Sequence, residues 1–244
     1  MANPIEVLND LEDVDVPDPD DGDILYYDEA SGLWKGKQPA VGGGTVERLV
    51  RASADDCSVH WNGSAWVFSL TWNYFWAGRF SAGYEKIGSA GLFRNIYIPK
   101  DATITHAYLK PTARDSDASL LVKTRIRGEK NDSPIAFSNY ADYDARTRTT
   151  AVVDWDDIAT WVLGTLYSSP DIKTIIKEIV ALAGWVSGNP LVIFWDDHEA
   201  RTATDIARLR RGRDWNHGLR TPPMLYIEWV AGGSGRRWPP KDKD

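Results

Sequence analysis

Hydrophobic and polar residues alternate over short stretches for much of the chain, and turn-forming residues separate these stretches. A period of two is typical of β-strands with one buried face. In residues 119–127 the positions of Val122, Thr124 and Ile126 share one face, while the basic residues between them share the other. The pattern is that of a β-sandwich. It predicts strands over residues 71–76, 92–98, 102–110, 119–127, 190–195, 205–210 and 224–230.

One stretch has helical periodicity. Isoleucines recur at intervals of three and four residues from Ile172 to Ile179, after Ser169-Pro170-Asp171 and before Gly184. Serine is a good N-cap, proline fits the first helical position, and an acidic residue suits the positive end of the helix dipole. The pattern predicts a helix over 169–183 that lies across a sheet, and a shorter helical turn over 156–163.

Two hairpin patterns precede these strands. In the first, Ile24 to Tyr27 and Leu33 to Lys35 flank a turn that ends at Gly32; in the second, the strongest two-residue turn signal, Asn62-Gly63, separates two short strands. Glycine-rich sequence lies between the two hairpins and predicts a linker. The predicted organisation is an acidic arm with a hairpin (1–39), a glycine linker (40–46), a second hairpin (47–70), a sandwich (71–231) and a flexible tail (232–244).

The chain has 244 residues, 12 tryptophans and a formal net charge of −7, which is unevenly distributed. Residues 1–34 contain eleven acidic residues and no lysine or arginine, whereas the remaining 210 residues contain 24 acidic and 28 basic residues. This asymmetry favours an arm that is a separate unit, either solvated or docked on a basic partner surface. We expect no nucleic-acid or membrane partner.

The cysteine content and the N-terminal sequence indicate the cellular compartment in which the protein is made. Cys57 is the single cysteine, so the fold has no internal disulfide. The sequence begins without a basic segment followed by an apolar run, and no 18 apolar residues occur together. We expect a protein that is made in a cytosol and is not exported by the secretory-signal route.

Two segments contain residues that could bind a metal ion, but neither matches a known metal-binding motif. An EF-hand alignment that places Gly22 at the sixth loop position puts Pro17 and Pro19 where carboxylates are needed. Residues 196–199 (Asp-Asp-His-Glu) follow a hydrophobic strand, but no second histidine occurs at ligand spacing. We interpret the first segment as a solvated acidic arm and the second as an exposed charged loop, and we expect no metal and no cofactor.

The sequence signals for catalytic residues are also weak. The chain has no Gly-x-Ser-x-Gly motif, and its four histidines are far apart in sequence. The carboxylates of Asp154, Asp156 and Asp157 would suit a glycosidase only if they faced each other across a cleft. We therefore expect a protein without enzymatic activity.

Two stretches are candidates for binding. Trp72, Tyr74 and Trp76 would share one face of a strand, where they would form a sugar-stacking platform or a subunit contact; the alternative is that this face is buried between sheets or subunits. The basic run at 208–213 suggests an exposed strand edge protected by charge. Its Arg210 and Arg211 could instead receive the acidic arm of a neighbouring subunit.

The arm and first hairpin resemble a short module of tailed-bacteriophage fibre and tail proteins. The motif runs L-x-D-hydrophobic, P-x-x-G-x-hydrophobic-L-x-Y-D and G-x-W, and its positions are occupied by Leu8, Asp10, Leu11, Val14, Pro19, Gly22, Leu25, Tyr27, Asp28, Gly32 and Trp34. The resemblance covers about an eighth of the chain. It implies attachment to a virion and a homotrimer of sister chains, with Leu25, Tyr27 and Trp34 as assembly contacts.

The body is similar to the carbohydrate-binding-module-like jelly rolls of phage structural proteins and secreted bacterial proteins. The matching stretches are residues 93–104, 169–191 and 222–229. The expected fold is therefore mainly β: a jelly-roll-like β-sandwich with one or two short helices, preceded by an extended arm and a small hairpin. The expected function is that of a phage virion structural protein which displays this sandwich, with other virion proteins and a host-surface glycan as partners. The alternative is a carbohydrate-binding adhesin module.

Overall fold

The computed structural model describes residues 14–15, 24–28, 33–37, 42–119, 121–203, 206–219 and 221–231, with side chains from residue 42 onward. The chain divides into two compact units, Met1–Gly43 and Gly44–Asp244. The predicted tail at 232–244 and most of the predicted arm lie outside the described residues.

The first unit contains the predicted hairpin. Strands β2 (Ile24–Asp28) and β3 (Leu33–Lys37) pair antiparallel, and β1 (Val14–Asp15) pairs parallel with β3. Tyr27 is opposite Trp34 in the register. The side chains of Leu25, Tyr27 and Trp34, which we expected to make assembly contacts, lie outside the described part of the chain.

The second unit is a β-sandwich, which confirms the predicted fold class. Its larger sheet has the order β11-β10-β12-β8-β5-β6, and β7 joins it through β8 and pairs with β13. Its smaller sheet has the order β4-β14-β9. The strands are β4 (Gly44–Leu49), β5 (Asp56–Trp61), β6 (Trp66–Ser69), β7 (Phe75–Arg79), β8 (Glu85–Phe93), β9 (Thr103–Lys110), β10 (Thr124–Glu129), β11 (Arg148–Trp155), β12 (Leu191–Asp196), β13 (Arg208–Gly212) and β14 (Met224–Val230).

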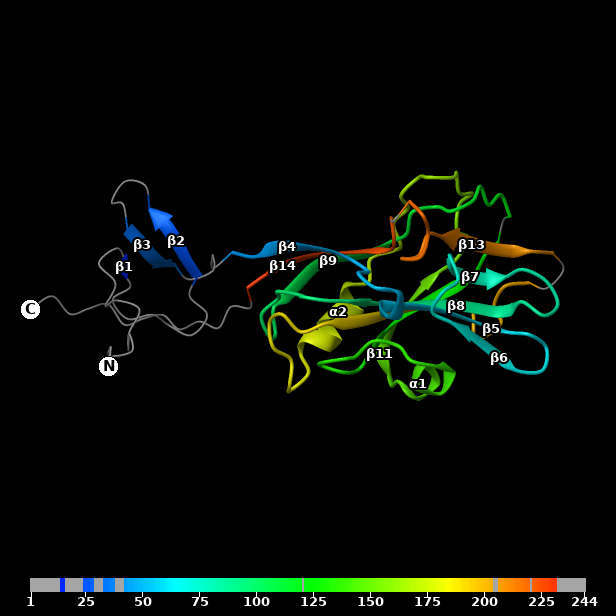
Figure 1. Cartoon of the computed structure of the whole chain (residues 1–244), viewed down its shortest axis with the longest axis horizontal. Helices are drawn as coiled ribbons and strands as arrows, with labels where there is room; N and C mark the ends of the chain where they lie inside the picture. The colour runs from blue at the N-terminus through cyan, green and yellow to red at the C-terminus, as the bar shows by residue number, and fades with distance from the viewer. Residues whose placement is uncertain are drawn as a thin grey trace, which may run out of the picture. The chain divides into compact units, whose positions relative to one another are not determined.

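The chain crosses repeatedly between the two sheets, as in a jelly roll. It runs from β4 in the smaller sheet through β5–β8 in the larger one, returns at β9, passes through β10–β13, and closes with β14 between β4 and β9 (Figure 1). All the strand pairs described in this unit are antiparallel. Strands far apart in sequence therefore become neighbours, which brings separate loops together at the ends of the sandwich.

The main core lies between the sheets and beneath helix α2 (Lys173–Val180). The helix packs against β9, β10 and β11 and buries Ile175, Ile176, Ile179 and Val180. A second, smaller core covers the other face of β5, β8 and β12, where Tyr143 of helix α1 (Tyr140–Ala145) contributes. The larger sheet is consequently buried on both faces along its central strands.

Several predicted strands agree closely with the structure. The strands predicted at 102–110, 190–195 and 224–230 are confirmed by β9, β12 and β14. The assignment of faces around β10 is also confirmed, since Val122, Thr124 and Ile126 are fully buried.

Other boundaries were wrong. The stretches 71–76 and 92–98 overlap only the first residues of β7 and the end of β8, and the region predicted at 205–210 is β13 at 208–212. Strand β11 and helix α1 were not predicted. Strand β8 was missed because the centre of its sequence, Gly88-Ser89-Ala90-Gly91, consists of small residues with low strand propensity.

The predicted helix start was also wrong. Helix α2 begins at Lys173, and Ser169 and Asp171 serve the neighbouring strand: Ser169 Oγ accepts from Leu109 N at 3.0 Å, and Asp171 Oδ1 accepts from Ala107 N at 3.1 Å. The predicted turn at 156–163 is not helical. Its backbone amides bond to another segment, since Trp161 N donates to Asp117 O at 2.9 Å.

The second predicted hairpin is present but is not a separate domain. Strand β5 pairs with β6 on one side and with β8 on the other, so residues 47–70 belong to the sandwich. The predicted linker at 40–46 overlaps β4, which begins at Gly44 and pairs with β14. The boundary between the two units falls at residue 43.

Candidate functional site

An aromatic pocket of about 620 Å³ lies beside β7 and the β7–β8 turn. This volume falls within the range of small-molecule sites. One segment before and within β7 supplies most of its wall. The lining residues are Thr71, Trp72, Asn73, Tyr74, Trp76, Phe80, Tyr84, Arg211 and Asn216.

Two buried serines hold the segment that carries the central rings. Ser89 Oγ accepts from Trp76 N at 2.8 Å and donates to Trp76 O at 3.0 Å, and Ser58 Oγ donates to Tyr74 O at 2.6 Å. Strand β7 pairs with β8 at only one described residue pair, Gly78 with Ile87, so these side-chain bonds replace the missing backbone ladder. They fix the positions of Tyr74 and Trp76.

The aromatic rings form a continuous stack around Trp76. Tyr74 stacks on Trp76 with ring centroids 5.0 Å apart, and Trp72 meets Trp76 edge-on at 5.9 Å. His60 is stacked between Trp72 at 5.1 Å and Tyr84 at 4.6 Å. Offset and edge-to-face pairs of this kind are mutually stabilising, so the pocket is preorganised.

Two buried polar atoms of this cluster have no hydrogen-bond partner among the described residues, namely His60 Nδ1 and Trp76 Nε1. Trp76 is only 5% exposed, yet it lines the pocket. Burial lowers the pKa of His60, so its ring is neutral at neutral pH. An unpaired buried N–H is costly, and a hydroxyl group of a ligand would satisfy it.

Charges at the rim are paired. Arg211 donates from Nε to Asp117 Oδ1 at 3.0 Å and lies 3.4 Å from Asp115. Arg114 bonds to Asp115 at 2.7 Å and covers the ring of Tyr74 at 4.1 Å. The two guanidinium groups are thus balanced by two carboxylates.

Asn216 lies in a loop that a buried carboxyl group anchors. Asp214 accepts from His217 N at 2.9 Å and lies 3.4 Å from Asn216 Nδ2, while Asn216 Nδ2 donates to Leu70 O at 2.7 Å. Burial raises the pKa of Asp214 to about 6. The loop therefore holds the side-chain amide of Asn216 at the pocket.

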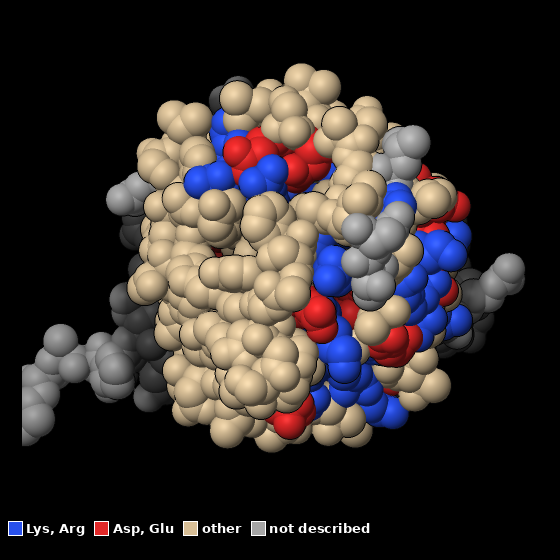
Figure 2. All heavy atoms as spheres, turned by 90° about the vertical axis from the view of Figure 1, so that its right-hand side faces the viewer, with Lys and Arg blue, Asp and Glu red and all other residues tan. Residues whose placement is uncertain are grey.

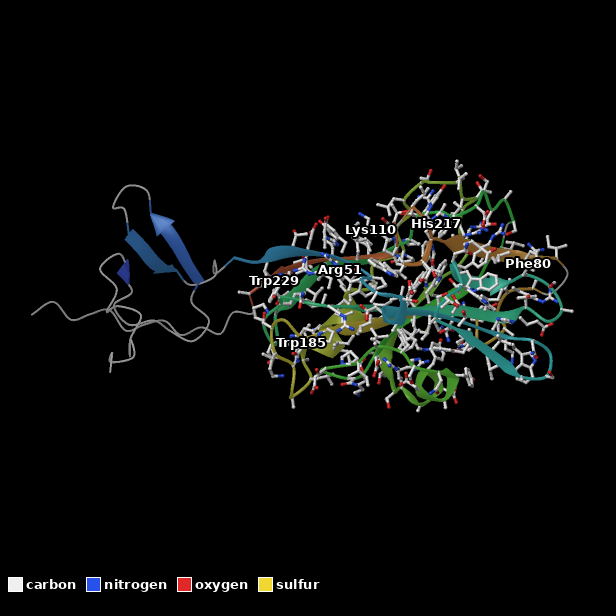
Figure 3. The ribbon with its side chains drawn as sticks, viewed as in Figure 1. Arg51, Phe80, Lys110, Trp185, His217 and Trp229 are labelled. Carbon is white, nitrogen blue, oxygen red and sulfur yellow. The ribbon has the colours of Figure 1, made fainter. Side chains whose placement is uncertain are left out.

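The end of the sandwich that carries Phe80 has an area without charged residues. Figure 3 shows Phe80 at this end, opposite the end that carries Trp185 and Trp229. Figure 2 faces the Phe80 end and shows a broad area without lysine, arginine, aspartate or glutamate, with charged residues above it and to its right. Phe80 and Tyr84 are 46% and 40% exposed, so aromatic surface is accessible to a ligand.

The structure brings the three predicted aromatic residues together, although not as one strand face. Strand β7 begins at Phe75, so Trp72 and Tyr74 precede it. Trp76 is buried, but the three side chains line a pocket instead of the core between the sheets. Sequence reasoning missed His60, Phe80, Tyr84 and Asn216, because they come from elements that only the fold brings together.

The interpretation of Arg210 as part of an exposed edge was wrong. Arg210 is fully buried and donates to three backbone carbonyls of other segments: Ser119 at 2.7 Å, Ala159 at 2.9 Å and Ile158. It cannot receive an acidic arm. Arg211 is partly exposed, but Asp115 and Asp117 already occupy its guanidinium group.

The carboxylates that we considered for metal binding have structural partners. Asp196 and Asp197 are buried, which corrects the expectation of an exposed loop. Asp197 accepts from Arg201 N at 2.7 Å and from Thr202 N at 3.1 Å, and Glu199 pairs with Arg125 and Arg127. In the described part of the chain, no group of three or more potential ligands is placed to hold a metal ion.

Two of the three carboxylates that we considered for catalysis, Asp154 and Asp156, are likewise in ion pairs. Asp154 bonds to Arg125 at 2.6 Å, and Asp156 bonds to Arg201 at 2.6 Å. These arginines help to lower the pKa of Asp154, the first cause being its hydrogen bond to Arg125. A carboxylate held in its ionised form is a poor general acid.

No protein-family model matches the chain, and no curated protein matches it either. Among the described residues there is no helix with the length and apolar character needed to span a membrane.

Proposed function

We propose that the chain is a non-enzymatic structural protein of a tailed-phage virion, and that its sandwich binds host-surface glycans in the aromatic pocket. The observation that carries the proposal is the pocket itself: rings of Trp72, Tyr74 and Trp76 beside the polar side chains of Asn73 and Asn216. One face of a sugar ring presents C–H groups, which aromatic rings attract, while its hydroxyl groups need hydrogen-bond partners.

The division of the chain into two units supports a role in display. Residues 1–43 form one unit, which includes the stretch that resembles the fibre and tail module. The sandwich has its own core and carries the pocket. In the proposed function the first unit attaches to other virion proteins and to sister chains, with a homotrimer as the expected assembly.

Glycan-array binding tests the pocket. We expect the full chain to bind a subset of glycans, and Trp72→Ala to weaken this binding about tenfold, or about 1.4 kcal/mol, because one stacking surface is lost. Trp66→Ala is the matched control: Trp66 is also half-buried, but it stacks on Tyr140 away from the pocket. Equal binding by the wild type and Trp72→Ala would contradict the assignment of the site.

A particle-association assay tests attachment. Deletion of residues 1–43 should abolish incorporation into virions and reduce the solution mass to that of a single chain. It should leave glycan binding by the sandwich intact. Incorporation without these residues would contradict the proposed role of the first unit.

A carbohydrate-binding adhesin outside a virion is the second candidate, because the same pocket would serve it. Glycan binding that depends on Trp72, together with no particle association of the full chain, would favour this candidate.

A further inference from the structure

The charges around the aromatic pocket show which glycans it can accept. Arg211 is the one charged residue among the described lining residues, and its Nε and Nη2 groups bond to Asp117. Arg114, on the outer side of Tyr74, is paired with Asp115. Two positive groups thus face two negative groups, and Asp214 adds a partly ionised carboxyl near Asn216. Among the described residues, both guanidinium groups at the rim are paired with carboxylates.

Most of the polar groups that remain without a partner at the pocket are uncharged. Trp76 Nε1 is buried and unpaired, and the side chains of Asn73 and Thr71 have no hydrogen-bond partners among the described residues. The same holds for Nη1 of Arg211. Hydroxyl groups can both donate to and accept from such a set, whereas the positive charge that a carboxylate or sulfate would need, on Arg211, is already balanced by Asp115 and Asp117.

We infer that the pocket selects uncharged saccharides, and that the N–H of Trp76 donates a hydrogen bond to a sugar hydroxyl at its base. This inference rests on the proposed function and adds the class of ligand. An anionic ligand would lose its hydration in the pocket without gaining an unbalanced positive partner, which is costly. Anionic oligosaccharides should therefore bind at least about tenfold more weakly than neutral ones of the same length.

The test is titration of the full chain with matched neutral, uronic-acid-containing and sialylated oligosaccharides, at about 0.05 M and about 0.5 M NaCl. Neutral ligands should bind best, with an affinity that changes less than about twofold between the two salt concentrations. Tighter binding of anionic ligands that weakens steeply with salt would overturn the inference but leave the proposed glycan binding in place. Absence of binding to any saccharide would refute the proposed function and the inference together.

Variants give an independent check on the two parts of the inference. Asp115→Asn should raise the affinity for anionic ligands at least about threefold, because it leaves the arginines undercompensated. Asp154→Asn is the matched control, since it removes a paired surface carboxylate away from the pocket. No difference between these two variants would contradict the role of charge at the rim.

Trp76→Phe keeps an aromatic ring and removes the N–H group. It should weaken the binding of neutral saccharides about tenfold, in the range expected for a lost hydrogen bond. Thermal unfolding establishes whether the variant is folded. If Trp76→Phe binds neutral saccharides as tightly as the wild type, the N–H contact is refuted.

Discussion

Arg210 allows a quantitative test of how the loops are fixed to the sandwich. Its side chain is fully buried, and five hydrogen bonds occupy its five N–H groups. Three acceptors are carbonyls of residues 119, 158 and 159, which lie in segments without regular secondary structure. Burial lowers the pKa of Arg210, because the guanidinium group loses its hydration inside the protein.

Replacing Arg210 by methionine keeps an unbranched side chain in the same buried space and removes all five N–H donors. Each buried carbonyl left without a partner costs about 1 to 3 kcal/mol. Three such carbonyls, partly relieved by water or relaxation, correspond to about 3 to 6 kcal/mol. This is a large share of the about 5 to 15 kcal/mol that stabilises a typical protein.

Urea unfolding followed by tryptophan fluorescence measures the effect. For a slope of about 2 kcal/mol per molar urea, the midpoint of Arg210→Met should fall by about 1.5 to 3 M. Arg51→Met is the control, because Arg51 is exposed (Figure 3) and its replacement should change stability by less than about 0.5 kcal/mol. A loss below about 1 kcal/mol for Arg210→Met would refute the reasoning.

Two further predictions concern the core and the response to pH. Gly128→Ala should lower the free energy of unfolding by about 1 to 3 kcal/mol in the same urea assay, because the new Cβ would lie 2.6 Å from Ile179 Cδ1 and 2.8 Å from Ile175 Cγ2; unchanged stability would mean that α2 shifts freely. Asp214 should contribute stability at low pH that is lost as pH rises from about 4 through about 6, because burial raises its folded pKa to about 6 above its unfolded value of about 3.9. The stability of Asp214→Asn relative to the wild type should therefore increase by about 2 to 3 kcal/mol between pH 4 and pH 7, and a pH-independent difference would contradict this assignment.

The sequence predicts strands that have one buried and one solvated face, and it also predicts β12, a run of large apolar residues that is buried throughout. Strands β9 and β14 are of the first kind, and their alternation gives boundaries within a residue of the structure. Strand β8 is also buried along most of its length, but the small residues at its centre have low strand propensity. Helix α1 has only six residues and two tyrosines, and its signal is confined to Asn139, whose side chain accepts from Asp142 N.

Predictions from local sequence fail where a side chain bonds to residues that are far away in the sequence. Ser169-Pro170-Asp171 has the composition of a helix start, but Ser169 and Asp171 bond to backbone amides of β9, and α2 begins later. Arg210 shows the same limit, because a basic run in sequence looks exposed until the fold surrounds it with carbonyl groups.

The candidate site was only partly predictable for a related reason. The density of aromatic residues at 72–76 identifies one wall of the pocket. The other walls come from the β7–β8 turn, from β13 and from the region after β13. The pairing of Arg211 with Asp117, which sets the charge at the rim, joins residues 94 positions apart.

The central claim is that the aromatic pocket is the glycan-binding site. A crystal structure of the full chain with the tightest-binding oligosaccharide from the array tests it most directly. The account predicts a sugar ring against Trp72 and Trp76, with a hydroxyl group within hydrogen-bond distance of Trp76 Nε1. A sugar bound elsewhere, for example on the outer face of the smaller sheet beside Tyr108 and Tyr226, would contradict it.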